Sequence, residues 1–306
     1  MVAVSDATGD VAGDAAGDAA GVRVAGLSRG MWHMVNAAVF FSVMGLCVRL
    51  LAGMPFMQVV VARSAISLVL SAVLLLRRGI PVFGPNWRLN LARGFFGFLG
   101  LSSYFYSLQM LPLGEAVTVQ YTNPLFTALF APFILKERGT GREWVAMAVA
   151  FAGVLLIANP SAPDRIVPVL VGLFGAMCSG IAYNLVRKLG RAGEDPLTIV
   201  LYFPLVSLVL GTPLAAADLV MPDTTGLLLL VCVGVTTQIA QVSMTRGLRA
   251  ERASRATVVN YLVIALSTVF SFALGEELRV MALAGIACIV AGMIVVTRGA
   301  ASVRTA

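Results

Sequence analysis

Apolar residues fall into ten stretches along the chain, separated by short polar segments. Each stretch is close to the roughly 20 residues that a membrane-spanning helix needs. The stretches lie near residues 31–51, 55–76, 91–111, 115–135, 143–159, 167–186, 196–217, 225–245, 255–274 and 280–297. This pattern predicts an all-α integral membrane protein with ten transmembrane helices.

Two segments of the chain, 115–159 and 254–298, share one hydropathy pattern. The positions that are identical in this register are Thr118/Thr257, Val119/Val258, Leu135/Leu274, Glu137/Glu276, Ala148/Ala287, Ala152/Ala291 and Gly153/Gly292. The basic junction Lys136-Glu137-Arg138 becomes the acidic Gly275-Glu276-Glu277 in the second copy. Since five helices are an odd number, we expect a first five-helix repeat over 31–159 and a second, inverted repeat over 160–298.

The composition agrees with a membrane protein, because 59% of residues are hydrophobic and only 12% are charged, against about 25% charged in soluble domains. Alternating loops hold most of the bases, among them Arg77, Arg78, Arg88 and Arg93, whereas the opposite loops hold only Arg49, Arg165 and Arg279. Cytoplasmic loops carry such an excess of Lys and Arg. This asymmetry predicts a multi-pass protein of a bacterial-type inner membrane, with both termini in the cytoplasm.

The net charge of +7 follows from these orienting loops, so nucleic acid is not an expected partner. The segment 1–30 repeats Gly, Asp and Ala with few bulky apolar residues, and such a segment cannot offset its ordering entropy by burial. We expect 1–30 to be a disordered cytoplasmic tail rather than a signal peptide. A second short tail, 299–306, is expected at the other end of the chain.

Several features together resemble a transporter family. They are the two five-helix halves, Arg63 in the second helix, the passage from Tyr106-Ser107-Leu108 to Leu113-Gly114-Glu115-Ala116, and the Lys136-Glu137-Arg138 junction with its acidic counterpart. Over residues 31–298 the chain resembles the EamA-repeat type of the drug/metabolite transporter superfamily. The resemblance implies a secondary transporter working by alternating access. It leaves the substrate open, because this family carries amino acids, nucleosides, sugars and other metabolites on one scaffold.

Other kinds of chemistry find no support in the sequence. His33 is the only histidine, the four cysteines have no metal-ligand spacing, and no phosphate-binding loop is present. We therefore expect no metal, no cofactor and no enzymatic activity. The acids nearest the helices, such as Glu115, Asp218 and Glu276, fall at helix ends or in loops. Because proton-coupled carriers usually place an acid or histidine within the membrane, a facilitator or exchanger is favoured, and hydrophobic cations are disfavoured as substrates.

Helical periodicity indicates which polar side chains share a face. One stripe of polar side chains lies on the ninth predicted helix, and the internal repeat maps this stripe to the fourth. Smaller sets of polar side chains lie on the first, third, sixth and eighth predicted helices. A second polar row on the fourth helix, Gln120, Asn123 and Thr127, is interrupted by Pro124, a residue that favours a kink. The predicted substrate-binding residues are Asn36, Arg63, Ser102, Tyr106, Thr118, Tyr121, Thr122, Tyr183, Asn184, Gln238, Gln241, Thr257, Asn260 and Tyr261.

Each of these residues has a structural alternative. Polar side chains in membrane helices often bond a neighbouring helix, a membrane tyrosine often packs or lies at the interface, and Arg63 has the alternatives of binding a substrate carboxylate or bridging to another helix. A neutral, tyrosine-rich cavity is similar to that of aromatic amino-acid exporters of the YddG type.

Three other functions remain open from the sequence. They are uptake of a nucleoside-type metabolite such as S-adenosylmethionine, a non-transporting receptor, and an intramembrane enzyme. The expected partners are a small-molecule substrate and the lipid bilayer, with the chain as a monomer or homodimer.

Overall fold

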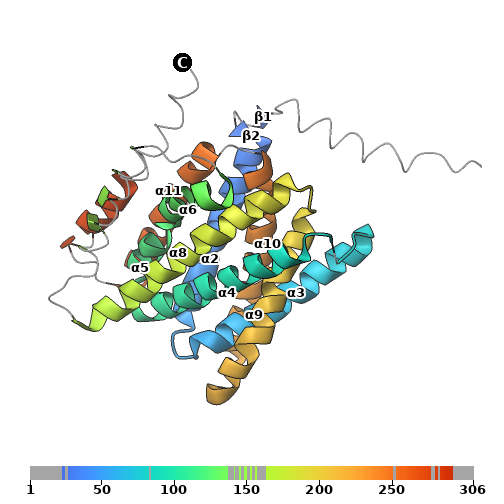
Figure 1. Cartoon of the computed structure of the whole chain (residues 1–306). Coiled ribbons are helices and arrows are strands. Elements are labelled where there is room, and N and C mark those ends of the chain that lie inside the picture. The colour runs from blue at the N-terminus through green and yellow to red at the C-terminus, as the bar shows by residue number, and fades with distance from the viewer. Residues whose placement is uncertain are drawn as a thin grey trace, which may run out of the picture.

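In the computed structural model the chain forms a bundle of long helices that cross one another (Figure 1). The structure describes residues 23–24, 27–82, 84–136, 163–250, 253–276 and 283–291, with isolated positions in 141–156 and at 280–281. The side chains of 248–261 lie outside this description. Within these residues the fold is helical apart from a short strand pair, which confirms the predicted all-α class.

The helices of the first half follow the predicted apolar stretches. They are α2 Arg29–Leu50, α3 Phe56–Arg78, α4 Trp87–Met110, α5 Leu113–Gln120 and α6 Asn123–Ile134. The predicted fifth helix, 143–159, falls largely outside the described residues. The helix α4 begins four residues earlier than the stretch 91–111 suggested, because Trp87 and the polar residues that follow it are already helical.

The second half is also helical. Its elements are α8 Pro163–Arg191, α9 Pro196–Ala215, the 3-10 turn η1 Ala216–Asp218, α10 Thr224–Ala250 and α11 Ala253–Ala273. Residues 283–291 are helical too and belong to the predicted tenth helix. Together with the first half, these elements confirm the predicted ten-helix architecture wherever the structure describes the chain.

Part of the predicted tail has local structure. The two-residue strands β1 Arg23–Val24 and β2 Leu27–Ser28 pair antiparallel, and α2 starts directly after them at Arg29. The first helix therefore begins two residues before the predicted boundary. The predicted disorder of 1–22 falls outside the described residues.

Helices of the two halves pack against one another in reciprocal pairs. The first helix of each half packs along the third helix of the other, as α2 with α10 and α8 with α4. The second helices pair with each other, as α3 with α9, and each fourth helix lies on the first helix of the opposite half. Figure 1 shows α4 and α8 running side by side through the centre of the bundle. This exchange of partners between the halves brings residues from both into one central region.

The predicted fourth helix is broken rather than continuous. The helix α5 ends at Gln120, Tyr121 and Thr122 form a turn, and α6 begins at Asn123 with Pro124 in its first turn. Proline lacks an N–H and fits the first turn of a helix, where no backbone acceptor is needed. The break therefore corrects the single helix expected over 115–135, and it turns Tyr121 and Asn123 toward the centre of the bundle.

Five of the described helices are long and apolar enough to cross a membrane by length and composition, namely Trp32–Leu50, Phe56–Arg78, Asp164–Arg191, Pro196–Asp218 and Thr224–Gly247. The helix α4 is long enough to cross a membrane but is less apolar than these five. Its sequence carries Arg93 and several Ser and Tyr residues. Such a helix is suited to the interior of a bundle, where other helices shield it from lipid.

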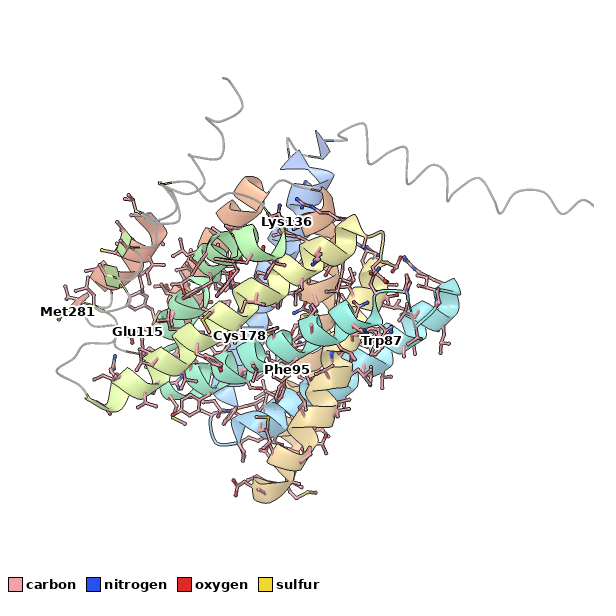
Figure 2. All side chains as sticks on the ribbon, in the orientation of Figure 1. Trp87, Phe95, Glu115, Lys136, Cys178 and Met281 are labelled. Atoms are coloured by element: carbon pink, nitrogen blue, oxygen red, sulfur yellow. The ribbon has the colours of Figure 1, made fainter. Side chains whose placement is uncertain are left out.

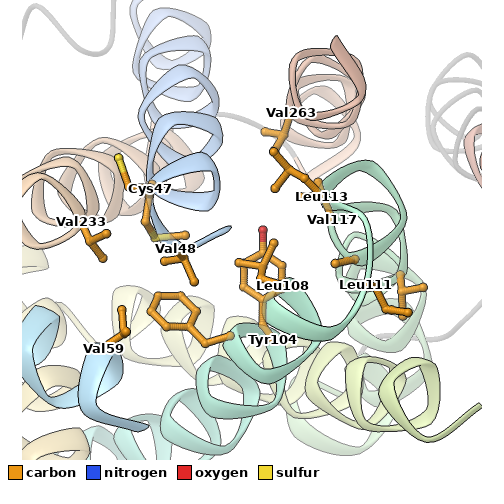
Figure 3. Close-up of a cluster of buried hydrophobic side chains, with 14 of the residues drawn as sticks. Cys47, Val48, Val59, Tyr104, Leu108, Leu111, Leu113, Val117, Val233 and Val263 are labelled. Carbon is orange, nitrogen blue, oxygen red and sulfur yellow. The ribbon is translucent and has the colours of Figure 1, made fainter. Parts of the chain in front are cut away.

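A layer of apolar side chains fills the bundle where α2 ends, α3 begins, α4 ends and α5 begins. Val48, Val59, Leu108 and Leu113 come from these four helix ends and are each completely buried. Figure 3 shows them with Val233 of α10 and Val263 of α11 around Tyr104. The tight packing of side chains from both halves leaves this end of the bundle closed.

Candidate functional site

A central cavity lies between the two halves of the chain. Its empty space, part of which is open to solvent, is about 650 Å³. The lining comes from α2, α3, α4, α5, α6, α8, α9 and α10 and from the turn between α5 and α6. The lining residues are Phe41, Met44, Arg63, Arg93, Gly97, Leu101, Tyr104, Gln120, Tyr121, Asn123, Ser179, Ala182, Tyr183, Phe203 and Gln241. A site lined by both halves is the position in which an alternating-access carrier binds its substrate.

Arg63 is the largest fully buried side chain of the described residues and faces this cavity from α3. Its guanidinium carbon lies 4.9 Å from the ring centroid of Phe203 and 5.8 Å from that of Phe105. Among the described residues, its Nε and Nη1 atoms have no hydrogen-bond partner. Aromatic faces offset part of the cost of burying a cation, yet a buried charge without an anion is costly. Arg63 therefore has unused capacity to bind an anion.

Arg93 is a second buried cation in the same cavity. It lies in the second turn of α4, is 3% exposed, and its guanidinium carbon is 4.5 Å from the ring centroid of Phe203. Its Nη2 donates a long hydrogen bond of 3.4 Å to Oε1 of Gln241, while Nε and Nη1 have no partner in the described part of the chain. The sequence analysis counted Arg93 among the bases of a cytoplasmic loop, and the structure corrects that assignment.

The error over Arg93 has an identifiable cause. The apolar stretch begins only at residue 91, so Arg93 looked like a residue at a helix boundary. Trp87 offered a signal, since tryptophan is enriched at the interface between membrane and water. A helix start at Trp87 places Arg93 about 9 Å deeper along the helix axis, at 1.5 Å per residue.

The cavity combines these cations with neutral polar groups. Gln120 donates from Nε2 to Oγ of Ser179 at 2.9 Å, and its buried Oε1 has no partner among the described residues. Tyr104, Tyr121 and Tyr183 supply aromatic walls. None of the lining residues is acidic. The arrangement therefore offers strong donors, one free acceptor and aromatic surface to a bound molecule.

Four of the predicted substrate-binding residues meet in this cavity: Arg63, Tyr121, Tyr183 and Gln241. Four others make hydrogen bonds within the protein. Thr118 donates to the Gly114 carbonyl at 2.6 Å, Thr122 to the Val119 carbonyl at 2.7 Å, Asn184 to the Thr127 carbonyl at 2.9 Å and Gln238 to Oγ of Ser71 at 2.9 Å. These contacts agree with the structural alternative considered for polar residues in membrane helices.

The remaining predicted residues do not line the cavity or lie outside the description. Asn36 is exposed, Ser102 is half-buried, and Tyr106 packs edge-on against Phe56 with ring centroids 5.6 Å apart. The side chains of Thr257, Asn260 and Tyr261 are outside the described residues. Conversely, Arg93, Gln120, Asn123, Ser179 and Phe203 line the cavity without having been selected as binding residues.

A second group of charged residues, buried or partly buried, lies at the end of the bundle that the apolar layer fills. We call Arg49, Glu115, Arg165, Ser271 and Glu276 the end cluster. Glu276 forms an ion pair with Arg49 and accepts hydrogen bonds from Oγ of Ser271 and, at 2.8 Å, from the backbone N–H of Leu113. Arg165 pairs with the fully buried Glu115 at 3.0 Å. Figure 2 shows Glu115 at the opposite end of the bundle from Trp87.

Both ion pairs of the end cluster secure the start of α5. Glu276 follows α11 and holds the N-terminal N–H of this helix, while Arg165 of α8 holds the carboxylate in its first turn. Arg49 also donates to the Gln109 carbonyl at 2.8 Å, which ties in the end of α4. The end cluster therefore joins segments of both halves over the apolar layer.

Comparisons with known proteins agree with this architecture. The model of the EamA-like transporter family matches residues 28–159 and again 166–298. The pseudopaline exporter CntI of Pseudomonas aeruginosa is 31% identical over 278 residues, or 89% of this chain and 97% of that protein. A solved crystal structure covers 87% of this chain and 96% of its own, with a TM-score of 0.65 and 22% identity, which supports the fold alone.

More distant relatives are transporters as well. An S-adenosylmethionine uptake transporter of Rickettsia prowazekii is 25% identical over 189 residues, covering 62% of this chain and 64% of that protein. The solute carrier family 35 member G1 of Mus musculus is 25% identical over 266 residues, covering 80% and 71%. The two matches of the family model coincide closely with the two predicted repeats. The chain is therefore a multi-pass membrane protein that belongs to the EamA-like transporter family.

Proposed function

We propose that this protein is a secondary transporter that exports a small amino-acid-type metabolite across a bacterial inner membrane. The carboxylate of the substrate binds Arg63, and its apolar part lies among Tyr104, Tyr121, Tyr183 and Phe203. The carrier acts as a facilitator or exchanger, with inverted halves that expose the cavity alternately to either side. Aromatic amino acids are the first substrates to test.

The observation that carries this proposal is the unpaired state of Arg63 inside the cavity. A guanidinium presents its donors in a planar fork that matches the two oxygens of a carboxylate. A substrate carboxylate would supply the anion that the described residues around Arg63 do not. Binding therefore removes an electrostatic cost that the empty cavity carries.

The aromatic residues of the cavity support a substrate with a ring or another flat apolar part. Phe203 already stacks with both guanidinium groups, and three tyrosines line the same space. Small-molecule sites typically combine such apolar walls with a few polar groups that fix orientation. The export direction is supported by the similarity to the pseudopaline exporter.

The closed end of the bundle supports alternating access. The apolar layer and the end cluster join both halves at the end that the charge pattern places outside the cytoplasm. Opening the cavity there requires that these contacts separate. In this conformation, access from the opposite, cytoplasmic end is the expected route for a substrate that is to be exported.

Uptake of S-adenosylmethionine is the second candidate, because a relative of that activity is 25% identical and tyrosines would stack with an adenine ring. The cavity makes it less favourable. S-adenosylmethionine carries a sulfonium cation, and the lining contains two arginines and no acid. Cations near a desolvated guanidinium are repelled. Net import of the labelled compound into cells making the protein, without export of amino acids, would favour this candidate.

The experiment that tests the proposal is counterflow in proteoliposomes. Vesicles are loaded with unlabelled tryptophan or phenylalanine, at equal pH on both sides, and uptake of the labelled amino acid is measured. Uptake above that of empty liposomes, reduced by Tyr121→Ala and unchanged by Asp218→Asn at the exposed turn η1, is expected. Binding of the amino acid without movement would instead indicate a receptor. If the amino acid is neither bound nor transported, the assignment of aromatic amino acids is contradicted.

A further inference from the structure

The cavity holds one guanidinium more than a simple amino acid needs. Arg63 and Arg93 both stack on Phe203, with guanidinium carbons 4.9 and 4.5 Å from its ring centroid. The separation of the two cations therefore cannot exceed the sum of these distances. Each has two guanidinium nitrogens without a partner in the described part of the chain. Like charges at such a distance in a desolvated site repel each other, so the pair requires more than one negative charge to be compensated.

The helices that carry Arg93 and Phe203 are packed closely together. Adding a Cβ to Gly97 would bring it within 2.9 Å of the Phe203 ring, so α4 and α9 are in close contact there. Gly94 approaches the Tyr202 carbonyl of α9 in the same way, at 2.9 Å. Helices in such close contact fix the position of Arg93 relative to Phe203. The backbone of Arg93 is therefore held beside the ring on which both guanidinium groups stack.

A third group in the cavity accepts rather than donates. Oε1 of Gln120 is buried and unpartnered among the described residues, while Nε2 of the same side chain is held by Oγ of Ser179. Because that hydrogen bond fixes the amide, its oxygen is directed as an acceptor. An ammonium or secondary amine is the group that would satisfy it. The cavity thus presents two anion-binding groups and one acceptor for an amine.

We propose that the natural substrate is an amino dicarboxylate, in which one carboxylate binds Arg63, a second binds Arg93 and the amine donates to Gln120. This inference rests on the proposed function and specifies its substrate class. At neutral pH such a molecule carries a net charge of about −1. Its two carboxylates offset both guanidinium charges, its amine is taken up by Gln120, and its carbon skeleton lies against Phe203 and the tyrosines.

A matched pair of compounds tests the second carboxylate. N-carboxymethyl-phenylalanine adds a carboxylate to phenylalanine and retains its ring and amine, whereas N-(2-hydroxyethyl)-phenylalanine adds a neutral group of similar size. Both are measured in proteoliposomes as labelled substrates and as competitors. We expect the dicarboxylate to half-saturate transport at a concentration roughly 10- to 100-fold lower than the hydroxyethyl compound, the range for a charge-assisted hydrogen bond.

Variants assign this preference to Arg93. In Arg93→Gln the ratio between the two compounds should fall close to one, and in Arg93→Lys it should be partly retained. Arg88→Gln, which changes an exposed arginine one and a half turns earlier on α4, should keep the full ratio. Because the ratio is measured within each variant, a general loss of transport does not imitate the effect. Should Arg93→Gln fail to fold, the two compounds still give the ratio in the unmodified protein.

The possible outcomes are distinct for the two proposals. Transport of the dicarboxylate but not of phenylalanine supports the two-carboxylate site and contradicts aromatic amino acids as substrates. Equal half-saturation of the dicarboxylate and the hydroxyethyl compound overturns the two-carboxylate site and leaves the proposed transporter of amino-acid-type metabolites in place. Movement of none of these compounds, in vesicles where reconstitution is verified, overturns both.

Discussion

The end cluster and the central cavity both contain arginines, but in the described residues those of the end cluster are paired with acids and those of the cavity are not. In the end cluster Arg49 meets Glu276 and Arg165 meets Glu115. In the cavity Arg63 and Arg93 both stack on Phe203, Arg63 also lies near Phe105, and Arg93 makes a long hydrogen bond to Gln241. Paired charges hold segments of the fold together, whereas unpaired ones cost free energy that only a ligand can recover. The contrast supports the proposal that the cavity is the binding site.

The variant Arg63→Gln is expected to have the largest effect on transport. Removing the guanidinium should lower transport roughly 100-fold, equivalent to about 3 kcal/mol for a charge-assisted contact. The melting temperature in detergent should not fall, because an unpaired buried charge does not stabilise the empty protein. Arg77→Gln, at the exposed end of the same helix, serves as the control and should transport normally. A large drop in melting temperature with transport preserved would show that Arg63 is a structural bridge.

The opposite pattern is expected for Glu276→Gln. This change removes the partner of Arg49 and weakens the bonds from Leu113 and Ser271. Breaking a partly buried ion pair should cost about 2 kcal/mol of stability, read as a lower melting temperature. Half-saturation by substrate should change little, since Glu276 does not line the cavity. Asp218→Asn provides an exposed acid as control. An unchanged melting temperature would mean that the Arg49–Glu276 pair adds nothing to the stability of the bundle.

A smaller loss of stability is expected when Ser271 of the end cluster is changed. Ser271→Ala removes a donor to Glu276 and an acceptor for the N–H of Gly114, which lies 3.0 Å from Oγ. We expect a loss of about 1 kcal/mol, typical of one net hydrogen bond, and a smaller fall in melting temperature than in Glu276→Gln. The double variant Ser271→Ala/Glu276→Gln is compared with Glu276→Gln alone. If the two are equally stable, Ser271 stabilises the protein only through the carboxylate of Glu276.

The architecture could be predicted from the sequence because membrane-spanning helices are long apolar stretches that are easily recognised. Apolar stretches gave the helices that the structure describes, and the repeat of Lys136-Glu137-Arg138 as Gly275-Glu276-Glu277 indicated two related halves. Finer details depended on contacts that the sequence does not contain. Pro124 indicated a kink in one helix, yet the turn at Tyr121 and Thr122 divides the segment into α5 and α6.

The candidate site could be predicted from the sequence only in part. Arg63 stood out because a charge within an apolar stretch has few explanations. Gln241 and Tyr183 were found by their spacing, while Asn184 and Gln238, chosen by the same rule, bond within the protein. Periodicity shows that a residue faces away from lipid and does not show whether a neighbour or a cavity is there. Phe203 gave no signal, since its role depends on two arginines brought to it from other helices.

The placement of Arg63 also bears on how the chain enters the membrane during synthesis. An arginine near the centre of a nascent span costs about 2.5–3.5 kcal/mol in insertion experiments. The helix that carries it, Phe56–Arg78, is the most apolar of the five candidate spans in the described residues. Its many Val, Leu and Ile residues favour insertion enough to offset that cost. The apolar residues of α3 thus allow the translocation machinery to accept an arginine for which we propose a substrate as the partner.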